Sequence, residues 1–255
     1  MAIRTNYEPG DPCWADLMTP DIAAASQFYT EVLGWSAGEA NGDFGGYMMF
    51  LKDGQPVAGA MQWTPEDGAK SSWTIYLSVK DAAEAVSRAE ANGASVFVTP
   101  QVVGELGTMA VFGDAAGAVV GVWAPNQFSG FGVYDQSGAP SWFEHHSRDY
   151  NSAVSFYRSV FDWDLQPMSD TDEFRYSTAN HGEHQFAGFM DSSSFLAEGD
   201  AAQWAMYVGV DSVDDACAAV KRLGGTVLDE PADTPYGRIA AVADMACATF
   251  RLRQT

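Results

Sequence analysis

An internal repeat constrains this 255-residue chain more than any other feature of its sequence. The segment Pro12–Asp21 aligns with Pro140–Asp149, which begins 128 residues later, and both carry a proline, a tryptophan, an acidic residue and a closing aspartate at the same places. Further matches follow in the same order: Ala25–Tyr29 with Ala153–Tyr157, Val32–Trp35 with Val160–Trp163, Ala58–Met61 with Ala187–Met190, and Trp73–Val79 with Trp204–Val210. A duplicated module decides the architecture, because each copy must fold in the same way.

The repeat divides the chain into a predicted first domain at 1–125, a linker at 126–139 and a second domain at 140–255. The linker and its flanks are rich in Pro, Gly, Ser and Asn, which is typical of a connecting segment. Because it also contains Phe128, Phe131, Val133 and Tyr134, we expect it to pack across a surface.

Each copy divides again into two similar units. In the first unit, alternation predicts a strand at Cys13–Met18, and Asp21 is placed to cap a helix that ends at Gly34. The predicted elements of this unit are Cys13–Met18, the helix Ile22–Leu33, and strands near Tyr47–Lys52 and Val57–Trp63.

The pattern then restarts. The next unit is predicted to contain a strand at Trp73–Val79, a helix at Ala82–Ala91, and strands at Ser95–Val98, Met109–Gly113 and Ala118–Trp123. The order gives two βαβββ units in each copy and four in the chain. Mixed strands and helices in this order predict the α+β fold class.

Composition excludes several classes of partner. The chain has 34 acidic and 13 basic side chains and a net charge of −21, which opposes binding to nucleic acid and to anionic membrane surfaces. Its 3 cysteines have no paired spacing, so no disulfide framework is expected. Neither a signal peptide pattern nor an apolar run of about 18 residues is present, and we predict a cytoplasmic protein.

Three short motifs carry a family resemblance. They are Phe28-Tyr29 in the first predicted helix, Leu33-Gly34-Trp35 after it, and the late turn Asp114–Ala118. With the fourfold plan, they resemble the vicinal oxygen chelate (VOC) superfamily, which includes glyoxalase, bleomycin resistance protein and extradiol dioxygenase. The resemblance covers nearly the whole chain and is nearest to tandem two-domain actinobacterial members. It implies curled mixed sheets around clefts.

The same resemblance implies a place for one divalent metal, held by His or Glu on the first, fifth and last strands of a domain. The corresponding positions here are Trp14, Thr74 and Gly121 in the first copy, and Trp142, Ala205 and Arg251 in the second. A shift of one residue would turn each side chain to the other sheet face. We therefore expect no metal and no cofactor, and Arg251 would repel a cation.

Three polar residues share strand parity with the two tryptophans: Asp16, Glu144 and His146. They are the candidate catalytic residues, because a histidine beside a carboxylate suits proton transfer. A hydrogen-bonded pair that only seals a cleft, and a relocated metal site, stay open as alternatives. His145 is expected to face the opposite way.

A second pair of histidines, His181 and His184, falls in a predicted hairpin turn. Their spacing could suit a metal, but a solvent-exposed surface loop is the simpler interpretation.

Aromatic side chains surround the positions that a metal would occupy. The candidate ligand-binding residues are Trp14, Tyr47, Tyr76, Trp123, Trp142, Tyr176, Tyr207 and Arg251. Aromatic walls with a few polar groups suit a planar organic ligand. The alternative is that the same aromatics fill a closed core.

The leading hypothesis is a metal-independent protein that binds a hydrophobic or aromatic small molecule, such as an antibiotic or a polyketide intermediate, in one or both clefts. Whether it is also an enzyme stays open. The alternatives are an enzyme that uses Asp16, Glu144 or His146 as acid or base, a glyoxalase or dioxygenase with relocated metal ligands, and an interaction protein with closed clefts. Because four units can complete two clefts, we expect a monomer.

Overall fold

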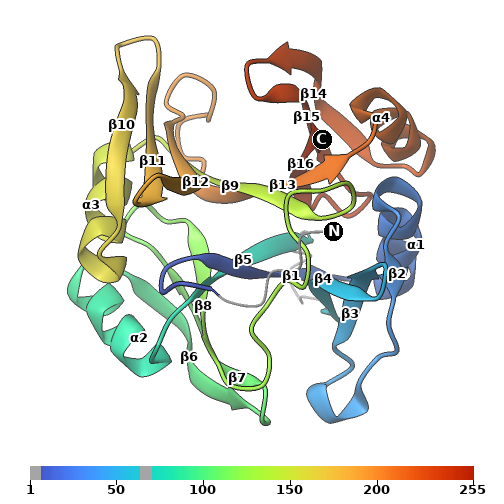
Figure 1. The fold of residues 1–255 in the computed structure, drawn as a ribbon, viewed down its shortest axis with the longest axis horizontal. Coiled ribbons are helices and arrows are strands. Elements are labelled where there is room, and N and C mark those ends of the chain that lie inside the picture. Colours follow the sequence, from blue (N-terminus) through green and yellow to red (C-terminus); the bar gives the residue numbers. More distant parts are fainter. Residues whose placement is uncertain (1–6, 64–70) are drawn as a thin grey trace.

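The computed structural model describes residues 7–63 and 71–255, which form two eight-stranded sheets with helices packed on them (Figure 1). We call β1–β8 with their helices the first half, and β9–β16 with theirs the second half. The first half contains β1 (Pro12–Thr19), α1 (Ile22–Leu33), β2 (Ser36–Ala37), the short 3₁₀ helix η1 (Gly42–Phe44), β3 (Met48–Lys52), β4 (Gln55–Gln62), β5 (Ser72–Ser78), α2 (Ala82–Ala91), β6 (Ser95–Val103), β7 (Gly107–Gly113) and β8 (Val119–Pro125).

The second half repeats this order. It contains β9 (Pro140–Ser147), α3 (Tyr150–Phe161), β10 (Asp164–Asp170), β11 (Arg175–His181), β12 (His184–Asp191), β13 (Gln203–Val210), α4 (Val213–Arg222), β14 (Thr226–Thr234), β15 (Gly237–Ala243) and β16 (Thr249–Gln254).

Both sheets have the same topology. The strand order is β2-β3-β4-β1-β5-β8-β7-β6 in the first and β10-β11-β12-β9-β13-β16-β15-β14 in the second. Within each unit the first and last strands pair in parallel, whereas the two units of a sheet join through an antiparallel pair, β1 with β5 and β9 with β13. The predicted α+β class with four βαβββ units is confirmed.

Local signals in the sequence define the helices. The carboxylate of Asp21 accepts a hydrogen bond from the backbone N–H of Ala24 at 2.9 Å, and Gly34 ends α1 in the left-handed conformation. Both predicted helices of the first half have the bounds that the sequence indicated. Within the described ranges, no helix is long and apolar enough to cross a membrane.

Most predicted strands of the first half differ from the structure by one or two residues at their ends, and the short β2 was not predicted. The strand predicted at Ser95–Val98 continues to Val103, because β6 is an edge strand that passes Pro100 through register shifts. Tyr47 lies just before β3 and pairs with Asn41 in an isolated bridge.

The helices pack between the halves. In Figure 1, α1 lies beside α4 on one side of the molecule and α2 lies beside α3 on the other. Residues of α1 contact residues of α4, and residues of α2 contact residues of α3. The hydroxyl of Tyr29 on α1 donates to Asp244 at 3.0 Å, and that of Tyr157 on α3 donates to Asp114 at 3.0 Å. The helix tyrosine of each half therefore bonds the late-turn aspartate of the other half, and both motifs serve to join the halves.

Candidate functional site

Each sheet has one face turned away from its helices, and these faces carry the predicted site residues. We call the face of the first sheet with Trp14 and Asp16 the first inner face, and the face of the second sheet with Trp142 and Glu144 the second inner face. Strand register aligns Trp14 with Tyr76 in one sheet and Trp142 with Tyr207 in the other. Aligned residues lie on the same face, so parity predicted this placement correctly.

On the first inner face, a small hydrogen-bonded cluster surrounds Asp16. Its Oδ1 accepts from the Tyr47 hydroxyl at 2.6 Å and from Trp14 Nε1 at 2.9 Å, and Tyr76 adds a further hydrogen bond. Burial raises the pKa of Asp16 to about 6, against the opposing effect of these hydrogen bonds. The carboxyl can therefore take up or release a proton close to neutral pH.

On the second inner face, the equivalent cluster surrounds Glu144. Its Oε1 accepts from His146 Nε2 at 2.7 Å and from the Tyr207 hydroxyl at 2.9 Å, while Oε2 accepts from the Tyr176 hydroxyl at 2.7 Å. Burial alone would raise the pKa of Glu144, but hydrogen bonding and the charge interaction with His146, with help from the two tyrosines, lower it. Glu144 is thus an ionised carboxylate held by three donors.

The histidine distinguishes the two clusters. His146 is fully buried, and its place is taken by Met18 in the first half. An ionised Glu144 can only accept, so His146 Nε2 carries a proton and Nδ1 faces away from the carboxylate. That Nδ1 has no hydrogen-bond partner among residues 7–63 and 71–255. Phe195, from the segment after β12, lies edge-on to the imidazole with ring centroids 5.7 Å apart.

Two glycines, which are not among the predicted site residues, allow these clusters to form. A Cβ on Gly59 would lie 1.7 Å from the Tyr47 hydroxyl, and one on Gly188 would lie 1.9 Å from the Tyr176 hydroxyl. The tyrosines can reach the carboxylates only across a bare backbone. The repeated Ala-Gly-x-Met segment was the available signal.

The linker covers part of the first inner face. Phe128 packs edge-on against Trp14 with ring centroids 4.8 Å apart, and its backbone carbonyl accepts a hydrogen bond from Trp123 Nε1 at 2.8 Å. Trp14 and Trp123 are consequently buried, at 5% and 8% exposed. The expectation that the linker packs across a surface is met, and for these two residues the packing interpretation of the aromatics applies.

The second inner face is less covered at its tryptophan, since Trp142 is half-buried where Trp14 is buried. Trp142 and Tyr176 are only half-buried, and Trp142 Nε1 donates to the Tyr176 hydroxyl at 3.3 Å. Arg251 lies beside Tyr207 in register, with its guanidinium carbon 5.7 Å from the centre of the tyrosine ring. Aromatic edges and one cation therefore frame the buried Glu144–His146 pair.

The other histidines lie elsewhere, and the prediction of an exposed loop holds for His184 but not for His181, which ends β11 and stacks on Phe186. His145 faces the helices, where its Nε2 is 2.7 Å from Asp114 Oδ2 and its ring stacks on Phe189. His184 is exposed beside a tight turn, and the half-buried His181 pairs with Asp11 at 3.0 Å.

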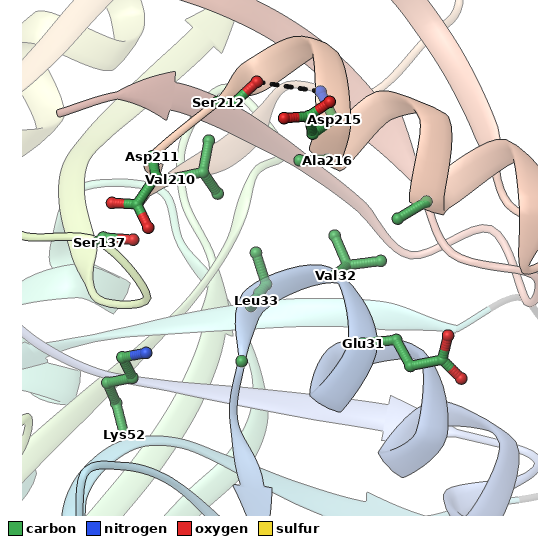
Figure 2. A pocket seen from close by; sticks show the side chains of 12 residues that line it. Glu31, Val32, Leu33, Lys52, Ser137, Val210, Asp211, Ser212, Asp215 and Ala216 are labelled. Carbon is green, nitrogen blue, oxygen red and sulfur yellow. Dashed lines mark hydrogen bonds between the residues drawn. The ribbon is translucent and has the colours of Figure 1, made fainter.

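Two cavities lie at the junction of the halves. One of about 290 Å³ lies between the end of α1 and the start of α4, with Glu31, Lys52 and Asp211 around it (Figure 2). A larger one of about 560 Å³ has Trp73 and Trp204 in its wall. None of the predicted site residues lines either cavity.

Comparison with known proteins decides the family. The family model described as Glyoxalase/Bleomycin resistance protein/Dioxygenase superfamily matches residues 13–122 and again residues 142–249. The chain belongs to this superfamily. The two matches fall on the two halves, so both copies of the repeat are VOC modules.

Relatives within the superfamily include two streptomycete proteins that match this chain over nearly their whole length. The chain is 32% identical to the anthracycline biosynthesis protein DauV of Streptomyces sp. (strain C5), and the match covers 96% of this chain and 94% of DauV. It is also 32% identical to the anthracycline biosynthesis protein DnrV of Streptomyces peucetius, with the same coverage. The Mn(II)-bound glyoxalase of Novosphingobium aromaticivorans shares the fold, with a TM-score of 0.66 at 15% identity over 96% of this chain and 82% of that one.

The side chains of this VOC protein do not fit the divalent metal that the superfamily implies. The ligand positions of the second half hold Trp142, Ala205 and Arg251, and the register places the cationic Arg251 beside Tyr207. The oxygens of Glu144 are already bonded to His146 and two tyrosines. Among the described residues, no group of three His, Cys, Asp or Glu side chains is arranged to hold a metal.

Proposed function

We propose that this VOC protein binds a planar aromatic small molecule at the second inner face, around Trp142 and Tyr207, without using a metal. The observation that carries the proposal is the contrast between the two faces. The linker buries Trp14, whereas its counterpart Trp142 is only half-buried beside a polar centre. Exposed aromatic edges with a few fixed polar groups provide stacking area and orienting hydrogen bonds.

The relatives support the same ligand class. DauV and DnrV are named for the biosynthesis of anthracyclines, which are fused-ring aromatic compounds, and each aligns over nearly the whole of this chain. A hydroxylated fused-ring polyketide combines the flat area and the oxygen atoms that this face could contact.

The test uses a neutral planar probe, anthraquinone-2-carboxamide, titrated into the intact protein while tryptophan fluorescence is followed. We expect saturable quenching that persists after treatment with EDTA. Trp142→Phe should remove most of the quenching, whereas Trp63→Phe, which changes a tryptophan that is 44% exposed in the first half, should leave the binding curve unchanged. Absence of saturable quenching, or equal loss in both variants, would contradict the proposal.

A second candidate function, an acid–base reaction on the bound molecule, is favoured by the geometry of His146. A carboxylate 2.7 Å from Nε2 fixes the ring, and Nδ1 has no partner in the described part of the chain. Because the imidazole is fully buried, this role requires Phe195 to move away from the ring, after which the Nδ1 lone pair could accept a proton from substrate while Glu144 stabilises the imidazolium. Turnover that survives Glu144→Gln would rule this function out, and turnover lost in that variant with binding retained would support it.

A further inference from the structure

Each inner face has a row of three residues that are in register on neighbouring strands. The two rows differ in charge at their third position. Across the first sheet the row is Trp14, Tyr76 and Gly121; across the second it is Trp142, Tyr207 and Arg251. In the first sheet the Tyr76 ring fills the space over Gly121. A Cβ on Gly121 would lie only 2.3 Å from a carbon of that ring. In the second sheet a guanidinium occupies the corresponding position.

The guanidinium of Arg251 has much of its hydrogen-bonding capacity unused. Within residues 7–63 and 71–255, its one hydrogen bond joins Nη1 to Asp229 Oδ2 at 3.5 Å, and the Asp229 side chain is 68% exposed. An exposed pair at this distance is weak and readily exchanged. Arg238 on the neighbouring strand provides the contrast, because it makes three hydrogen bonds to Asp214 and Asp233 at 2.6–3.0 Å.

The aromatic neighbour orients this cation. Arg251 lies over the ring of Tyr207, and the Tyr207 hydroxyl is bonded to Glu144 at 2.9 Å. The negative charge of Glu144 therefore lies at the hydroxyl end of the tyrosine, already matched by three donors, while the positive charge lies over the ring face. An anionic group that approaches Arg251 meets a fixed cation whose side chain is 21% exposed.

We propose that Arg251 makes the second inner face selective for an aromatic carboxylate, with the ligand ring against the half-buried Trp142 and its carboxylate on the guanidinium. This inference rests on the proposed function and names its ligand class. A guanidinium presents paired N–H donors that match the two oxygens of a carboxylate. The position that the family uses for a cation ligand thus becomes an anion site in this chain.

The experiment compares two probes that differ in charge and share one ring system, anthraquinone-2-carboxylate and anthraquinone-2-carboxamide. Dissociation constants are measured by calorimetry on the intact protein. We expect wild type to prefer the carboxylate by about tenfold, the size of one charge-assisted hydrogen bond. Arg251→Gln should reduce this ratio to about one through loss of carboxylate affinity, and Arg251→Lys should keep part of it.

Arg238→Gln is the matched control, because it removes an arginine of the same sheet whose donors are already occupied. It should leave the ratio unchanged, and circular dichroism should show that all variants are folded. Equal affinity of wild type for both probes, or an unchanged ratio in Arg251→Gln, would overturn the inference while leaving the proposed function in place. Failure of both probes to bind would overturn the proposed function as well.

Discussion

The late-turn aspartates, Asp114 and Asp244, give the sharpest test of how the halves are joined. Both are buried, and the Oδ1 atom of each accepts two backbone N–H groups at 2.8–2.9 Å. The Oδ2 atoms differ. Within the described ranges, that of Asp244 accepts only from Tyr29, whereas that of Asp114 accepts from Tyr157 and also lies 2.7 Å from His145 Nε2.

Replacement of each aspartate by asparagine keeps the Oδ1 contacts and removes the Oδ2 acceptor. Asp114→Asn therefore loses one more charge-assisted hydrogen bond than Asp244→Asn. Since such a bond contributes about 1.5–3 kcal/mol, we expect Asp114→Asn to be the less stable variant by about 2 kcal/mol at neutral pH. For a chain of this size, that difference corresponds to roughly 4–8 °C in Tm.

The pH dependence should separate the variants further. Burial would raise the pKa of Asp114, but hydrogen bonding and the charge of His145 outweigh it and lower the pKa. The ionised carboxylate therefore stabilises the fold at every pH above the ordinary carboxyl pKa, and this stabilisation is lost only at lower pH. The pKa of Asp244 is raised by burial, so its ionised form opposes folding and wild type gains stability as the carboxyl protonates. Between pH 7 and about pH 4, the deficit of Asp244→Asn should therefore grow, while that of Asp114→Asn stays nearly constant.

The assay is urea unfolding followed by circular dichroism at both pH values. Equal destabilisation by the two substitutions, or deficits that change in parallel with pH, would refute the assignment of the extra stabilisation to His145.

Three further predictions concern the inner faces. Gly188→Ala should cost about 1–3 kcal/mol in urea unfolding, since the new Cβ would lie 1.9 Å from a tyrosine hydroxyl, whereas Gly42→Ala, with no atom within 4 Å of its Cβ, should be nearly neutral. The carboxyl carbon of Asp16 should titrate with a midpoint near pH 6 in ¹³C NMR, and a midpoint near 4 would show that burial does not control it. Phe128→Ala should increase the quenching of Trp14 fluorescence by acrylamide. Unchanged quenching would show that the linker does not cover that tryptophan.

The sequence predicted the fold well because its strongest signals are local. Capping aspartates fixed the starts of α1 and α2, and Gly34 fixed the end of α1. The misjudged end of β6 has the opposite character. Whether Pro100 interrupts a strand depends on the strand lying at the sheet edge, which only the assembled topology reveals.

The candidate site shows the same division. Alternation along β1 was enough to place Asp16 on the same face as Trp14. Alternation along β9 likewise placed Glu144 and His146 on the same face as Trp142. The tyrosines that complete each cluster come from other strands of the sheet, and their contacts with the carboxylates depend on Gly59 and Gly188. Such contacts depend both on the register between strands and on a glycine that leaves room for the tyrosine. The pattern of one strand alone therefore does not predict them.

The linker gives a physical reason for the divergence of two faces that began as copies. A chain of two fused modules has one linker, and here it crosses the first inner face, where Phe128 takes up the space beside Trp14 and Trp123. On the same face Gly121 lies under the ring of Tyr76, so the position that carries Arg251 in the second half has no side chain here. The second inner face is not covered by that segment at the equivalent tryptophan, and the Arg251 side chain keeps its access to solvent. On this reasoning, asymmetry between the faces follows from the fusion itself, and the charged position is expected on the face that the linker leaves free.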